Sequence, residues 1–106
     1  MKRLKNKLPP VHPGEILREE FMKPLGLSAS ALAKGLGVAP ITVNLLLRGQ
    51  RNISAELALR LARYIGTTPE FWMGLQGQYD LDVAQDEAEE RIARQVHRCP
   101  LVPVTA

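Results

Sequence analysis

The chain has 106 residues, of which 45% are hydrophobic, and its formal net charge is +3. This length fits one domain with a modest core, and no apolar run approaches the roughly 20 residues that a membrane-spanning helix needs. Prolines follow the basic start in place of an apolar stretch, which argues against a secretory signal peptide. The single cysteine, Cys99, excludes an internal disulfide and indicates a reducing cytoplasm.

Charge is unevenly distributed along the chain. Residues 1–79 carry 11 lysines and arginines against 5 acids, whereas residues 80–106 carry 3 against 6. A basic body suits a polyanionic partner, and four cations of a flexible arm over residues 1–11 are expected to add phosphate contacts: Lys2, Arg3, Lys5 and Lys7. The acidic stretch is expected to face away from DNA, either as a solvated helix face or toward a basic protein.

The first predicted helix spans about Pro13–Lys23. Proline suits the first turn of a helix, because its missing N–H would have no partner there. Helical spacing turns Ile16, Leu17 and Phe21 inward. Pro24 and Gly26 are expected to end the helix.

Two short helices joined by a tight turn follow, over about 29–35 and 40–48. Ser28 is a good N-cap for the first of them, and Gly37 can take the positive φ of the turn. A small residue at Ala33 lets the second helix cross closely. Apolar side chains face inward from both helices and the turn: Leu32, Leu36, Val38, Val43 and Leu46. This pattern is typical of a helix-turn-helix, whose second helix enters the major groove of DNA.

The candidate DNA contacts project outward from this pair. They are Ser28, Ser30, Lys34, Pro40, Ile41, Thr42, Asn44, Arg48 and Arg51. Asn44 can pair with an adenine edge and Ile41 can pack on a thymine methyl, while Arg48 and Arg51 suit phosphates. Ser28 and Ser30 flank a helix N-terminus that can hold another phosphate. The alternative for Asn44, Arg48 and Arg51 is an ordinary solvated surface residue, and the alternative for Ile41 is burial in a dimer or partner contact. Since the second helix starts without Arg, Lys or Gln, we expect modest specificity, or specificity through shape and apolar contact.

Two further helices are predicted. The fourth spans about Ala55–Ile65 behind an N-cap at Ser54, and the fifth starts after Thr68. Apolar periodicity continues to about His97, in a helix that is either continuous or broken near Asp80. No strand pattern is convincing, so the chain is predicted to be all-α, with a loose tail over 99–106.

Three of the five Phe, Trp and Tyr residues lie within residues 71–79. Large aromatics anchor interfaces, and a small DNA reader usually works as a dimer. The predicted homodimer interface therefore comprises Phe71, Trp72, Leu75 and Tyr79. The alternative is that these side chains belong to the core.

An enzyme is not expected. The two histidines, His12 and His97, lie near opposite ends of the chain, and neither has neighbouring ligands typical of zinc. His12 precedes Pro13 and is interpreted as a helix-start residue. No metal or cofactor is predicted.

Longer motifs resemble the HigA-type antitoxins of the lambda-repressor-like helix-turn-helix group. The most specific are His-Pro-Gly-Glu at 12–15 and Pro-Glu-Phe-Trp at 69–72, and the resemblance extends over about residues 12–81. It implies a five-helix DNA-binding domain over 12–81, and the apolar periodicity beyond it predicts a helical extension over 82–98. It also implies a dimer that represses its own operon and neutralises a small basic ribonuclease toxin.

Two other functions remain open at this stage. One is a stand-alone phage-type repressor without a toxin. The other is an interaction module whose apolar recognition helix no longer reads DNA.

Overall fold

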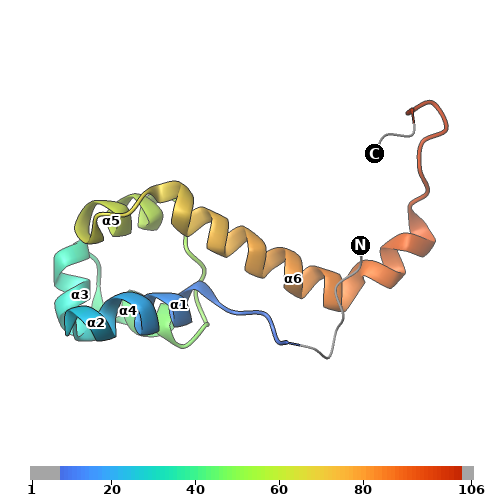
Figure 1. Cartoon of the computed structure of the whole chain (residues 1–106). Coiled ribbons are helices and arrows are strands. Elements are labelled where there is room, and N and C mark those ends of the chain that lie inside the picture. The colour runs from blue at the N-terminus through green and yellow to red at the C-terminus, as the bar shows by residue number, and fades with distance from the viewer. Residues whose placement is uncertain (1–7, 104–106) are drawn as a thin grey trace.

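The computed structural model describes residues 8–103, and every described element is helical. Five helices gather into a body from which the last one projects, so the chain measures 53 × 28 × 22 Å along its principal axes (Figure 1). The predicted all-α class and five-helix architecture are confirmed. The arm cations Lys2, Arg3, Lys5 and Lys7 lie outside the described residues.

The first helix is continuous over residues 13–25 and changes its winding twice. It comprises α1 (Pro13–Ile16), a π-helical segment η1 (Leu17–Met22) and α2 (Lys23–Leu25). The expectation that Pro24 helps to end this helix is wrong, because Pro24 lies in its last segment. A proline inside a helix lacks an N–H and crowds the preceding turn, and the wider π-helical turn relieves that crowding. Gly26 ends the helix with φ 66°.

The helix-turn-helix consists of α3 (Ala29–Leu36) and α4 (Pro40–Leu47). The Ser28 hydroxyl caps α3 by accepting a hydrogen bond from the Ala31 N–H at 3.1 Å. Gly37 ends α3 with φ 71°, the left-handed conformation that the turn requires. Both helices match their predicted spans to within one residue.

Helix α5 (Ala55–Ile65) matches its predicted span and is capped by the Ser54 hydroxyl. Helix α6 (Pro69–Gln95) is unbroken, which settles the question left open at Asp80. Its first turns pack against α1 and α5, and its later turns extend away from the body (Figure 1).

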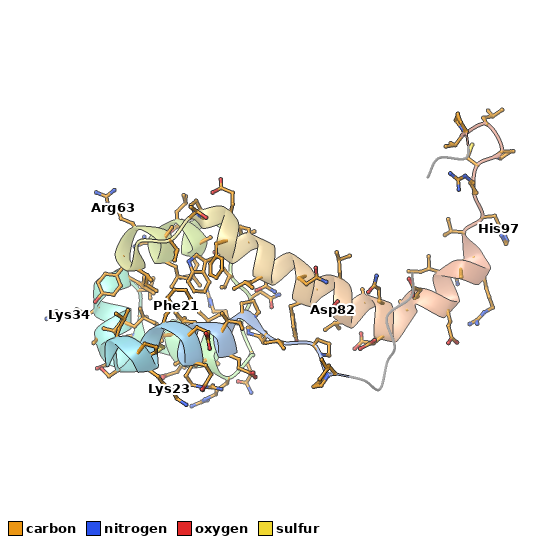
Figure 2. The ribbon with its side chains drawn as sticks, viewed as in Figure 1. Phe21, Lys23, Lys34, Arg63, Asp82 and His97 are labelled. Atoms are coloured by element: carbon orange, nitrogen blue, oxygen red, sulfur yellow. The ribbon has the colours of Figure 1, made fainter. Side chains whose placement is uncertain are left out.

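The core lies between α3, α4, α5, the first helix and the start of α6. Its buried apolar side chains include Leu17, Leu32, Leu36, Val43, Leu46, Leu57, Leu61 and Trp72. Trp72 has no exposed surface, and its indole N–H donates to the Thr67 hydroxyl at 2.7 Å. The rings of Phe21 and Trp72 lie 5.2 Å apart between their centroids, and Phe21 points into the body (Figure 2). The burial of Trp72 favours the core alternative for this residue over a dimer contact.

Replacing Trp72 with alanine removes the largest fully buried side chain. We expect Trp72→Ala to lower the free energy of unfolding by about 3–5 kcal/mol, because a cavity remains where the indole packed. Urea denaturation followed by circular dichroism measures this loss. Met73→Ala is the matched control, since Met73 is the next residue and is 40% exposed. Equal losses in the two variants would contradict a core role for Trp72.

Candidate nucleic-acid interface

The outward side of α4 is mostly apolar. Pro40 and Ile41 are exposed, with 57% of Ile41 accessible, while Thr42 and Asn44 are half-buried. Val43 and Leu46 on the opposite side are fully buried in the core. The helix therefore presents its first turn and the Asn44 side to a partner, with hydrogen-bonding groups at only two of these positions.

Cations and small polar residues surround this surface. Arg48 is the C-cap of α4, Arg51 is exposed in the loop that follows, and Lys34 and Ser30 are exposed on α3. Lys34 lies at the end of the body opposite the tip of α6, and Asp82 lies along α6 outside the body (Figure 2). The geometry thus separates the cations near α3 and α4 from the acids of α6.

A hollow of about 230 Å³ lies between the start of α4 and the start of α5. Its lining residues are Val38, Thr42, Arg51, Ser54, Glu56, Leu57 and Arg60. The hollow brings Thr42 of α4 close to Arg51 of the loop, although the two are nine positions apart in sequence. These predicted contact residues therefore share one surface with the α5 N-terminus.

Two arginines from other helices donate hydrogen bonds to carbonyl groups at the C-terminal ends of α3 and α4. Arg18 donates to the carbonyl oxygen of Leu47 at the end of α4, at 3.2 Å. Arg60 on α5 donates to the carbonyl oxygens of Leu36 and Gly37 in the turn, at 2.9 and 3.4 Å. Carbonyl groups at a helix C-terminus lack intrahelical partners and carry partial negative charge, so guanidinium groups satisfy them well.

Each of these arginines is also held by an acid. Glu19 accepts from Arg18 at 3.0 Å and from Lys23 at 2.9 Å. The hydrogen bond from Lys23 and then that from Arg18 lower the pKa of Glu19. Glu56 accepts from Arg60 at 3.1 Å. Neither arginine was predicted as a site residue, because the partner carbonyls are 23 to 29 positions away in sequence.

Gly14 allows α1 to approach α4 closely. A Cβ at this position would overlap the carbonyl oxygen of Leu46. The preceding residue, His12, caps α1, since its Nδ1 accepts from the Gly14 N–H at 3.0 Å. The interpretation of His12 as a helix-start residue is thereby confirmed.

His12 also contacts the loop after α4 and the helix α6. Its ring lies edge-on to Tyr79, with 4.9 Å between centroids. Its Nε2 is buried and has no hydrogen-bond partner among the described residues. Burial lowers the pKa of His12 below its ordinary 6.5, and outweighs the opposing influence of Asn52, the Arg51 backbone and Asp80. His12 is therefore neutral when it caps α1 at neutral pH.

The predicted interface residues of α6 differ in exposure. Phe71 is 40% exposed, whereas Leu75 and Tyr79 are half-buried. Leu75 packs on the core. Among the four predicted interface residues, Phe71 is therefore the most accessible to a partner.

No group of three metal-ligating side chains gathers within residues 8–103. None of the helices in that range combines the length and the apolar character needed to span a membrane. The fold and the exposed polar rim of α3 and α4 define a protein of the helix-turn-helix class.

Comparisons with known proteins agree with this class. The model of the helix-turn-helix family matches residues 19–72. Virulence-associated protein I of Dichelobacter nodosus is 52% identical over 85 residues, which cover 80% of this chain and 79% of the relative. The solved structure of antitoxin GraA in complex with its operator has a TM-score of 0.82 and 52% identity, over 92% of this chain and 98% of that one. Pseudomonas aeruginosa antitoxin HigA, solved with the higBA promoter, has a TM-score of 0.82 and 45% identity, over 88% and 99% of the two chains.

The chain belongs to the helix-turn-helix family, in the group that contains the HigA-type antitoxins. The resemblance that the sequence motifs indicated is confirmed. This family consists of DNA-binding regulators and is not a class of enzymes.

Acid is expected to destabilise the fold through His12. Because the pKa of His12 is lower in the folded state, the unfolded state binds a proton first as the pH falls. The contribution of neutral His12 to the free energy of unfolding is therefore present above about pH 6.5 and is lost as the pH falls below it. Protonation of Nδ1 also removes the acceptor that caps α1. Denaturation midpoints measured at about pH 7.5 and pH 5.5 test this. His12→Asn retains a capping side chain that does not titrate in this range, and should lose less stability between the two values. An equal loss in both proteins would rule out His12 as the responsible group.

Proposed function

We propose that this chain is an antitoxin that binds operator DNA as a homodimer, represses its own operon and neutralises a small basic ribonuclease toxin. The observation that carries the proposal is the likeness to two antitoxins of 52% and 45% identity, over almost their whole length. Their structures were solved with an operator and with a promoter, respectively. The proposal places the protein with its DNA in the cytoplasm.

In this proposal the first turns of α4 enter the major groove. Asn44 reads a base edge, Ile41 and Pro40 pack against base methyl groups, and Thr42 bonds a base or a phosphate. The surrounding residues bind the two phosphate backbones: Ser28, Ser30, Lys34, Arg48 and Arg51. The exposure of Arg48, Arg51, Lys34 and Ser30 supports this division of roles.

The toxin is proposed to be a separate small basic protein encoded beside this chain. The six acids from Asp80 to Glu90 lie along α6, and Asp80, Glu87 and Glu90 are exposed there, so this stretch carries negative charge that complements such a partner. Co-expression of the adjacent small basic protein with and without this chain tests the pairing. Growth arrest that this chain relieves supports an antitoxin. Operator binding without relief would indicate a stand-alone repressor of the phage type.

DNA reading is tested with a promoter fragment and a scrambled duplex of the same length. We expect Asn44→Ala to weaken binding to the promoter by about 1–3 kcal/mol and to leave binding to the scrambled duplex nearly unchanged. Arg48→Ala should weaken binding to both duplexes and lower the log–log salt slope by about 0.9, because one phosphate contact is lost. Fluorescence anisotropy across a salt series measures these quantities. If Asn44→Ala weakens both duplexes equally, Asn44 does not read bases.

Dimerisation is tested at Phe71, which is 40% exposed on α6. We expect Phe71→Glu to yield a folded monomer that binds the promoter more weakly, because two half-sites about 34–36 Å apart need two linked copies. Met73→Glu introduces the same charge at an equally exposed neighbour, and should remain dimeric. Mass in solution distinguishes the two states. A dimeric Phe71→Glu variant would exclude this part of α6 from the interface.

A further inference from the structure

The loop between α4 and α5 carries Arg51, and its backbone is held from two directions. At its start, the Gly49 N–H donates to the Leu46 carbonyl oxygen at 3.1 Å and the Gln50 N–H donates to that of Leu45 at 2.9 Å. At its end, the Ile53 N–H donates to the side chain of Gln76 on α6, at 2.8 Å. The second contact joins residues 23 positions apart and fixes the loop to a different helix.

Gln76 is unusual among the described residues. It is the one polar side chain in residues 8–103 that is buried, with 4% of its surface exposed. Both ends of its amide are engaged, since Oε1 accepts from the Ile53 N–H and Nε2 donates to the Asp80 carboxylate at 2.9 Å. Because the carboxylate accepts only, it sets the orientation of the amide and directs Oε1 toward the loop.

The geometry of the loop connects this contact to the DNA-facing side. The Ile53 side chain is 2% exposed and packs in the core, whereas Arg51, two positions earlier, is exposed. His12, against Tyr79 on α6, packs beside Gly49 at the other end of the loop, where a Cβ would lie 3.6 Å from the His12 ring. Neighbouring turns of α6 thus support both ends of the segment from which Arg51 projects.

We propose that Gln76 is a positioning residue for DNA binding, which holds the loop after α4 so that Arg51 reaches a backbone phosphate. This inference rests on the proposed DNA-binding function. A buried side chain that only stabilised the fold would change the melting temperature and leave the number of phosphate contacts unchanged. A side chain that positions Arg51 changes that number, and the salt dependence of binding reports it.

The test compares promoter binding of the full chain, Gln76→Met, Arg51→Ala and the double variant, at a temperature well below every melting transition. Methionine retains the length and unbranched shape of glutamine and removes both hydrogen bonds. We expect Arg51→Ala to lower the log–log salt slope by about 0.9, and Gln76→Met to lower it by a similar amount. The double variant should match Arg51→Ala alone in binding, while the losses in melting temperature add.

Exchanging the amide of Gln76 with the carboxylate of Asp80 provides a second measurement, which is valid even if the Gln76→Met variant does not fold. Gln76→Glu retains the acceptor for Ile53 and sets two carboxylates against each other, so we expect weaker binding and a lower slope. Adding Asp80→Asn restores a donor–acceptor pair at the original net charge, and should return both quantities to those of the unaltered chain. Asp80→Asn alone is the control, and should bind at least as well as the unaltered chain.

The outcomes separate this inference from the function on which it rests. If the unaltered chain shows no preference for the promoter over a scrambled duplex, the proposed function fails. If it binds and the Gln76 variants keep the full salt slope, Gln76 has a structural role only and the inference is overturned. It is also overturned if Arg51→Ala leaves the slope unchanged.

Discussion

The orientation of α4 is the constraint on which the DNA-facing surface depends. This helix has only two fully buried apolar side chains, Val43 and Leu46, which pack it on the core. Further contacts at its two ends are needed to set its direction. Arg18 donates a hydrogen bond to the Leu47 carbonyl oxygen at the end of α4. Arg60 donates to the Leu36 carbonyl oxygen at the end of α3, just before the connection to α4. Both arginines belong to other helices, so the recognition surface is a property of the whole body and not of the helix-turn-helix alone.

Helix α6 performs two structural tasks along its length. Its first turns complete the core through Trp72 and support the loop after α4 through Gln76. Its later turns leave the body; the six acids lie over residues 80–90, and the stretch from residue 91, which is exposed throughout, carries Arg91, Arg94 and Arg98. One unbroken helix joins both parts.

The electrostatic arrangement follows the same division. Lys34, Arg48 and Arg51 lie on α3, at the end of α4 and in the loop that follows, whereas the six acids from Asp80 to Glu90 lie on α6, ahead of Arg91 and Arg94. Lys34 and Asp82 mark the two regions in Figure 2. Charges of one sign that gather on one face attract a polyanion in a particular orientation, and the acids in the middle of α6 disfavour approach to that part of the helix. The helix α4 itself contains no charged residue over Pro40–Leu47 and adds little to this field.

Local chemistry in the sequence determined the helices and their ends. Caps at Ser28, Ser54 and Thr68 and the glycine at 37 act within a few residues of themselves, which is why the starts of α3, α5 and α6 and the end of α3 were predictable. The tertiary structure decided what depends on distant partners. Trp72 became core because the Phe21 ring packs on it, and Arg18, Arg60 and Gln76 acquired roles from backbone groups 23 to 29 positions away. Hydrogen bonds to backbone groups leave no side-chain pattern, so only the folded chain brings these donors and acceptors together.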